Sequence, residues 1–335
     1  MMHSTCLPSP NKSTAAGRSS TRAAHRSGAG FTLPELLVVI AILAVLASLA
    51  TVGVMRAMDT ARQTRMKIEI DNIDTALKAY KEQYGSYPPC DLRDPANNAP
   101  LRAHVARAFP RYNINNLPGD LAVTGLDLMN FRPDQALVFW LRGFSPDVTN
   151  PFRDMNGRQI VNGATTGLPL YVPALFEFGP DRLMDLSGSR SGATFVEYPS
   201  YVPQGVKNNA PYVYFDGATL NNAFNQGLEV YWSPAVSLPL LSSVNYARAY
   251  FQDENGNRIA DLNQLDNSVP PGMGDPFVNM DSFQLFATGL DGQYSNVNMA
   301  AQPQTIYPEG TPYDTLYDDN VASFTDRARL GDAKP

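Results

Sequence analysis

The chain has 335 residues, which is enough for one large domain or two smaller ones together with a membrane anchor. Aromatic residues make up 10% and charged residues 17% of the chain, which is typical of a folded, loop-rich body and excludes a disordered one. The first 30 residues contain four basic residues and no acidic one, so the remainder has 22 basic and 32 acidic residues, a net charge of about −10. An acidic body argues against nucleic acid as the main partner and would suit a divalent cation.

An uncharged apolar segment follows the basic leader. Leu36 to Met55 is 20 residues long and lies between Glu35 and Arg56. As a helix it would extend about 30 Å, the thickness of one hydrocarbon core, and the basic leader predicts a cytoplasmic N-terminus. A plain anchor, or a secretory signal cut near Ser48-Leu49-Ala50, would also explain the segment. A signal peptide fits less well, because the basic region is long and Glu35 stands where the apolar core begins.

The residues around Glu35 form a specific motif. The sequence Gly30-Phe31-Thr32-Leu33-Pro34-Glu35-Leu36-Leu37 resembles the class III signal of type IV pilins and type II secretion pseudopilins. The resemblance implies cleavage after Gly30 by a membrane prepilin peptidase, N-methylation of the new terminus at Phe31, and pairing of Glu35 with the amino terminus of a neighbouring subunit. Such pairing makes physical sense, because a lone carboxylate in lipid is costly and a cationic amine lowers that cost. Pro34 departs from the usual aliphatic residue, but a proline is tolerated in the first helical turn.

A helix is expected to continue beyond the membrane. Apolar residues recur there at spacings of four and three, which predicts one buried stripe on a helix: Met66, Ile70, Ile73, Leu77, Tyr80 and Tyr84. Gly85 suits a C-terminal cap, and Pro88-Pro89 prevent continuation. We therefore predict a leader at 1–30, a helix at 31–84 that spans the membrane over about 31–55, and a globular domain at 85–335. The ending LKAYKEQYGSYPP is also similar to the end of the long helix in the major pseudopilin of type II secretion.

The body shows strand and turn signals. A helix is predicted over Pro133–Phe144, and His104, near two arginines, is expected on the surface. Five strands are predicted: Leu170–Val172, Ala174–Phe178, Tyr212–Phe215, Leu228–Trp232 and Ser282–Ala287. Four turns separate them: Asn156-Gly157, Asp216-Gly217, Asn255-Gly256 and Asp291-Gly292. The expected fold class is α+β and pilin-like, with the long helix packed on an antiparallel β-sheet domain.

One phrase occurs twice in the body. The segment from Phe152 to Ile160 is similar to that from Phe251 to Ile259, and each copy is followed by a Leu-Phe segment that ends in Gly-x-Asp. Either a hairpin was duplicated, or two hairpins use the same turn chemistry. Asp253-Glu254-Asn255-Gly256-Asn257 does not have the spacing of an EF-hand loop, so we interpret it as a turn.

A metal site is suggested by a second resemblance. The sequence FQLFATGLDGQY, with the later DDNVASF, resembles the calcium loop of the major pseudopilin. The resemblance implies Ca²⁺ ligation by Asp291, with Asp318 and Asp319 as the carboxylates of the later turn. The 27 positions between Asp291 and Asp318 exceed the family spacing. A turn beside an acidic surface loop is the alternative interpretation.

Cysteines and histidines limit the remaining chemistry. Cys6 lies in the leader, so Cys90 has no partner for a disulfide within a processed chain. His104 is the one histidine after residue 30, and no nucleophile, zinc or phosphate-loop motif is present, so we do not expect an enzyme.

The resemblance implies a structural subunit of a type II secretion pseudopilus that polymerises through its N-terminal helix and supports protein export. Its partners would be the prepilin peptidase and N-methyltransferase, other pseudopilin subunits and the inner-membrane secretion platform. The chain would cross the bacterial inner membrane once, with its body in the periplasm. Three alternatives stay open: a type IV or minor pilin for adhesion, motility or DNA uptake, a tethered binding protein that does not polymerise, and a tethered carboxylate enzyme.

Overall fold

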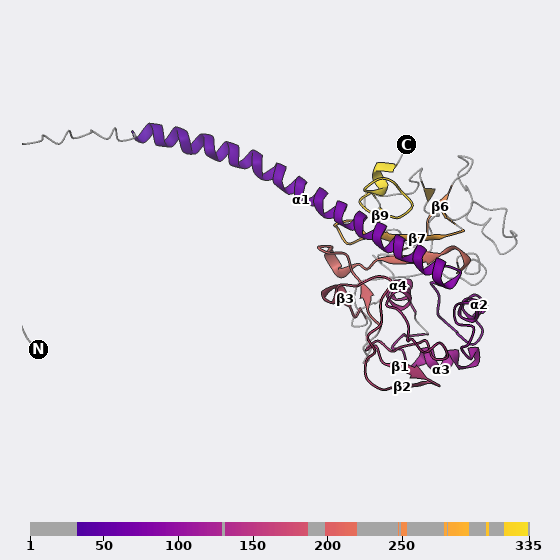
Figure 1. Cartoon of the computed structure of the whole chain (residues 1–335). Coiled ribbons are helices and arrows are strands. Elements are labelled where there is room, and N and C mark those ends of the chain that lie inside the picture. Colours follow the sequence, from indigo (N-terminus) through magenta and orange to yellow (C-terminus); the bar gives the residue numbers. More distant parts are fainter. Residues whose placement is uncertain are drawn as a thin grey trace, which may run out of the picture. The chain divides into compact units, whose positions relative to one another are not determined.

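The structure is a computed structural model, and it describes residues 32–128, 131–186, 198–219, 247, 249–252, 278–279, 281–294, 306–307 and 318–333. The chain divides into two compact units, Met1–Val54 and Met55–Pro335. A long N-terminal helix is followed by a domain of short helices and small sheets, so the predicted α+β, pilin-like class is confirmed (Figure 1).

Helix α1 covers Leu33–Tyr84, and its end agrees with the prediction. Gly85 has a φ of 84°, and its N–H donates to the Lys81 carbonyl at 2.8 Å, so a glycine caps the helix as expected. The predicted stripe is buried from Met66 to Tyr80, while Tyr84 is half-buried. The second half of α1 therefore contributes one face to the core of the body.

In the described part of the first half of the body, three further α-helices occur: α2 (Ala99–Ala108), α3 (Leu117–Ala122) and α4 (Pro133–Leu141). Helix α4 begins at Pro133 as predicted but ends three residues before Phe144, and all its residues are buried. Short 3₁₀ helices occur at Ile114–Asn116, Pro180–Arg182, Lys207–Asn209 and Leu330–Ala333.

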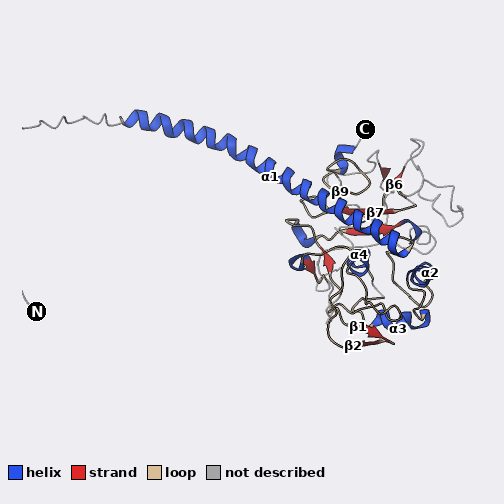
Figure 2. Ribbon diagram, in the orientation of Figure 1, coloured by secondary structure: helices blue, strands red, loops and turns tan. Residues whose placement is uncertain are grey.

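The strands form small sheets (Figure 2). Among the described residues, three of these sheets are antiparallel. They are the hairpin of β1 (Gln159–Val161) and β2 (Ala164–Thr166), the pair of β3 (Leu183–Met184) and β4 (Ser200–Tyr201), and the three-stranded sheet of β5 (Val213–Asp216), β7 (Phe283–Ala287) and β9 (Val321–Ala322). Strands β6 (Phe251–Gln252) and β8 (Ile306–Tyr307) pair in parallel. Because β7 is central, it joins the middle of the body to the C-terminal segment.

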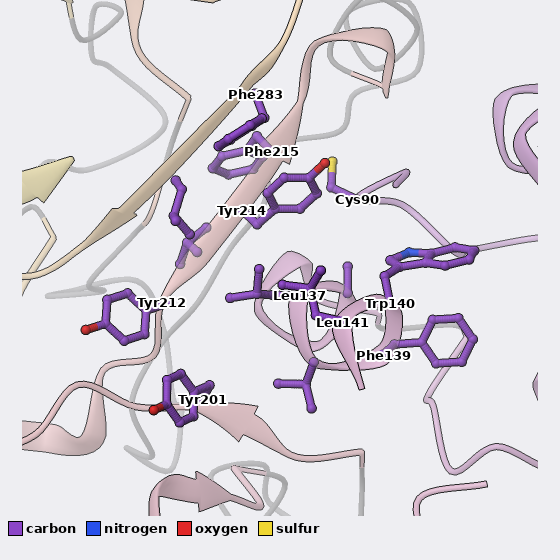
Figure 3. Packing of buried hydrophobic residues seen from close by; sticks show 14 of the residues in the cluster. Cys90, Leu137, Phe139, Trp140, Leu141, Tyr201, Tyr212, Tyr214, Phe215 and Phe283 are labelled. Carbon is purple, nitrogen blue, oxygen red and sulfur yellow. The ribbon is translucent and has the colours of Figure 1, made fainter. Parts of the chain in front are cut away.

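The core of the body lies between α4 and β5. Figure 3 shows Leu137 and Leu141 facing the strand that carries Tyr214, with Cys90 beside that tyrosine. The indole N–H of Trp140 donates to the Pro89 carbonyl at 2.9 Å, and the Tyr214 hydroxyl donates to the Pro88 carbonyl at 2.7 Å. The two prolines that follow α1 are therefore fixed by buried aromatic side chains.

Two predicted strands are close to those observed, since β5 and β7 differ from Tyr212–Phe215 and Ser282–Ala287 by one residue at one or both ends. The predicted strands at Leu170–Val172 and Ala174–Phe178 are wrong, because these residues are in neither a strand nor a helix. Their backbone is used elsewhere: the Leu170 N–H donates to the Gly157 carbonyl, and the Leu175 and Phe176 N–H groups donate to the Leu141 carbonyl at the end of α4. The strand predicted at Leu228–Trp232 lies outside the described residues.

The predicted turns differ in outcome. The Asp154 carboxylate accepts the N–H groups of Asn156 and Arg158, so a tight turn forms at Asn156-Gly157 as expected. At Asp216-Gly217 the prediction is wrong: Asp216 ends β5, and its carboxylate accepts the Cys90 and Thr219 N–H groups. The second copy of the repeated phrase and the Asn255-Gly256 turn, with Asp253 to Asn257, lie outside the described residues beyond Gln252.

Candidate assembly helix and acidic loops

The Glu35 side chain caps the start of α1. The Glu35 carboxylate accepts the Thr32 N–H at 2.8 Å and the Thr32 hydroxyl at 2.7 Å. Thr32 also accepts the first helical bond, from the Leu36 N–H at 3.1 Å. A threonine followed three positions later by a glutamate is the sequence signal of a capping box, so Glu35 can stabilise its own helix terminus as well as meet a partner. Gly30 and Phe31 precede the described residues.

The first half of α1 has the properties of a membrane span. Among the described residues, α1 is the one helix long and apolar enough to cross a membrane, and none of its most apolar window is buried. The hydroxyls of Ser48 and Thr51 donate to the carbonyls of Val45 and Ala47. The polar side chains in this segment are thus satisfied within the helix, as a hydrocarbon environment requires. These observations are consistent with membrane anchoring.

A partly buried ionic cluster joins the second half of α1 to the body. The Glu69 carboxylate accepts both terminal guanidinium nitrogens of Arg182 at 2.5 Å, the Tyr201 hydroxyl at 2.7 Å and the Tyr212 hydroxyl at 2.5 Å. Burial raises the pKa of Glu69, but these hydrogen bonds outweigh it and hold that pKa below its ordinary value. The charged glutamate therefore fixes where α1 contacts the body.

A lysine on the same turn contacts the C-terminal segment. The Lys67 ammonium donates to the Ala322 carbonyl at 3.0 Å and the Thr325 carbonyl at 2.8 Å, and it lies 3.2 Å from the Asp71 carboxylate. Neither Lys67 nor Glu69 belongs to the predicted apolar stripe, and these contacts were not predicted from the sequence. Their positions directly beside Met66 and Ile70 were the available signal, since residues that flank an apolar stripe lie at the edge of the packed interface.

His104 is a buried residue, and its predicted surface position is wrong. Its side chain is 5% exposed, its Nε2 lies 2.9 Å from the Tyr80 hydroxyl, and its Nδ1 lies 2.8 Å from the Ser86 hydroxyl. Burial, with a smaller effect of Arg107, lowers the pKa of His104 to about 4. The imidazole is therefore neutral at neutral pH and connects α2 to the end of α1.

The two acidic loops of the predicted metal site lie together. The Asp291 N–H donates to the Asp319 carboxylate at 3.4 Å, and the Gly289 N–H donates to the Asn320 side-chain oxygen at 3.3 Å. Burial and the nearby charge of Asp291 raise the pKa of Asp319 to about 6. Asp318 is held differently: its carbonyl accepts the Gly331 N–H at 3.0 Å, and its Cβ lies against that glycine. The fold thus brings Asp291 beside Asp319 across a long sequence separation.

One observation on these loops favours a bound cation, and another does not. One carboxylate oxygen of Asp319, Oδ1, is buried and makes no hydrogen bond. A bound cation would compensate for burying this oxygen. However, no group of three or more His, Cys, Asp or Glu side chains with metal-binding geometry occurs in the part of the chain that the structure describes. Main-chain carbonyls or water would have to complete any Ca²⁺ shell here.

Comparison with known proteins supports the N-terminal resemblance. The family described as the Prokaryotic N-terminal methylation motif matches residues 25–51, which include the predicted cleavage site and Glu35. Neither the curated proteins nor the solved structures contain a match to this chain. The motif supports a type IV pilin-like or pseudopilin protein, a class made of structural subunits. It implies processing by a prepilin peptidase and assembly with other pilin-like subunits.

Proposed function

We propose that the chain is a structural subunit of a type II secretion pseudopilus. In this proposal the peptidase cuts after Gly30 and Phe31 is N-methylated. The processed chain then polymerises through α1, with the body on the periplasmic side of the bacterial inner membrane. Other pseudopilins and the inner-membrane secretion platform are its partners. The observation that carries the proposal is Glu35, a carboxylate at the edge of an otherwise uncharged span, within the matched motif.

Cys90 favours a pseudopilus over a pilus. Type IV pilins often close a C-terminal loop with a disulfide. Cys90 is buried as a free thiol, and the chain's other cysteine, Cys6, lies in the predicted leader. The C-terminal segment is instead held by β9 pairing with β7 and by Lys67. A pilus or minor-pilus subunit is the second candidate, and the same matched motif supports it.

We also propose Ca²⁺ as a bound ion at the two acidic loops. Asp291 and Asp319 would supply carboxylate oxygens, and Asp318 would supply a further oxygen from the same turn. A divalent ion would offset the repulsion between Asp291 and Asp319, the second of the two causes that raise the pKa of Asp319. It would connect the end of β7 to the start of β9 and so stabilise a C-terminal segment without a disulfide.

Two experiments test the proposal in the native host. An amine-reactive cross-linker should trap oligomers of the chain in membranes, and Glu35→Ala should abolish them. Glu82→Ala, a change of an exposed glutamate on the same helix, should leave them intact. Deleting the chain should then reduce the export of folded proteins and leave surface pili in place. Loss of pili with normal export would favour the pilus, and oligomers that persist in Glu35→Ala would contradict polymerisation through this residue.

A further inference from the structure

Exposed apolar side chains in the body mark two surfaces. Among the described residues from Ile68 onwards, four large apolar side chains are more than half exposed: Ile68 at 54%, Val148 at 52%, Leu168 at 82% and Tyr171 at 100%. Ile68 lies on α1, and the other three lie in loops around the β1–β2 hairpin. Single exposed apolar residues are common, but a fully exposed tyrosine close to an exposed leucine is a candidate contact surface.

Hydrogen bonds hold the loop that displays Leu168 and Tyr171. The Leu170 N–H donates to the Gly157 carbonyl at 2.9 Å, and the Leu170 carbonyl accepts the Arg153 guanidinium at 3.0 Å. Proline at 169 and at 173 restricts the backbone on both sides. The side chains of Leu168 and Tyr171 are thus presented by a fixed loop, which lowers the entropy cost of docking.

An acidic residue, Asp147, is linked to this loop through the β1–β2 hairpin. The Asp147 carboxylate accepts the Gln159 side-chain N–H at 3.1 Å, and Gln159 pairs with Thr166, two residues before Leu168. Hydrogen bonds from Asn150 and Thr149 hold the pKa of Asp147 well below its ordinary value, so the carboxylate is charged at neutral pH. We define the loop patch as Asp147, Val148, Leu168 and Tyr171.

The exposed side of α1 has complementary chemistry. Arg65 is exposed one helical turn before Ile68, whereas Lys67 is directed to the body and paired with Asp71. We define the helix patch as Arg65 and Ile68. Figure 1 shows the β1–β2 hairpin apart from the part of α1 that packs on the body, so a contact between the two patches would join two molecules. The loop patch combines apolar side chains with the acidic Asp147, and the helix patch combines Ile68 with the basic Arg65, so the two patches are complementary in charge.

We propose that the loop patch of one copy of this chain docks on the helix patch of the next copy, with Leu168 and Tyr171 against Ile68 and Asp147 facing Arg65. Two different surfaces that meet in this way form a heterologous contact, which generates an open helical polymer when the rotation does not close. The inference rests on the proposed function, because it takes this chain to be a polymerising subunit.

Thiol cross-linking of the processed chain, which lacks Cys6, in its native membrane tests the contact. Cys90 is buried, so it does not compete for the reagent. A chain with both Ile68→Cys and Leu168→Cys should give a ladder of multimers with a short bifunctional thiol reagent. Cells that express the two single variants together should give dimers, and each single variant alone should give monomers. As a matched control, Leu168→Cys with Glu82→Cys should give no ladder, because position 82 lies about 21 Å along the helix from position 68.

The outcomes separate this inference from the proposed function. The absence of a ladder, while an amine-reactive reagent still traps Glu35-dependent oligomers, would overturn the contact and leave the proposed function standing. The absence of both would overturn both. Dimers from the Leu168→Cys chain alone would also overturn the contact, because like loops would then meet. Arg65→Glu, a change on an exposed helix face, should reduce the ladder about threefold or more.

Discussion

The Glu69 cluster should make a large contribution to the stability of the body. Glu69→Ala removes a carboxylate that accepts four hydrogen bonds and leaves the Arg182 guanidinium without its ion pair, with its Nε still donating to the Val202 carbonyl. Breaking a fully buried pair costs about 3–5 kcal/mol. The two side chains here are 18% and 19% exposed, so water recovers part of that cost. We expect a loss of about 2 kcal/mol in the free energy of unfolding, or about 4–8 °C in Tm for a body of this size.

The assay is urea or thermal unfolding of the processed chain in detergent, followed by tryptophan fluorescence, since Trp140 is fully buried in the core. The exposed Glu82→Ala change on the same helix is the control and should cost less than about 0.5 kcal/mol. Because the folded pKa of Glu69 is lowered, its contribution should be present above the unfolded value of about 4.3 and disappear as the pH falls through the folded value. A loss below about 0.5 kcal/mol at pH 7, or an undiminished one at pH 2, would refute the reasoning.

Three further predictions follow from particular contacts. The pKa of His104 falls to about 4 on folding, so below pH 6.5 the unfolded chain binds a proton that the folded chain does not. As the pH falls from 6.5 to 4, the free energy of unfolding should therefore decrease by up to about 3 kcal/mol. Urea unfolding at both pH values measures this loss, which a His104→Asn variant should not show. Gly143 has a φ of 82°, and an added Cβ would lie 2.5 Å from the Pro173 carbonyl oxygen, so Gly143→Ala should cost about 2 kcal/mol or more. The same change at Gly53, inside helix α1 with nothing within 4 Å, should cost nothing, because alanine is the better helix former. Saturating Ca²⁺ should stabilise the native chain by about 2–3 kcal/mol and leave Asp319→Asn unchanged in a thermal shift assay; an equal response of both chains would contradict the proposed site.

Local patterns made the long helix predictable. The spacing of the apolar stripe, the glycine after Tyr84 and the paired prolines each depend on neighbouring residues alone, and all three agree with α1 and its cap. The motif around Glu35 is equally local, and it was the segment that the family comparison matched. Strands β5 and β7 were predictable to within about one residue because both are short runs rich in aromatic and branched apolar residues.

Contacts between residues far apart in the sequence determine the features that the sequence did not predict. His104 is buried because Tyr80, Ser86 and Trp140 surround it, and nothing in its own neighbourhood of charged residues indicates that. The segment after Leu170 has strand-forming residues, but Arg153 and the end of α4 take its backbone groups. Asp291 and Asp319 come together because β7 and β9 pair, a register that sequence spacing alone does not predict.

The central claim is pilin-type processing, and the N-terminal peptide of the protein from its native membrane tests it most directly. Intact-mass and peptide mass spectrometry should find a chain that begins at Phe31 and carries one methyl group on its amino terminus. A chain that keeps Met1, or one that begins near Thr51, would contradict the account, because Glu35 would then have no amino terminus to meet at the edge of the membrane span.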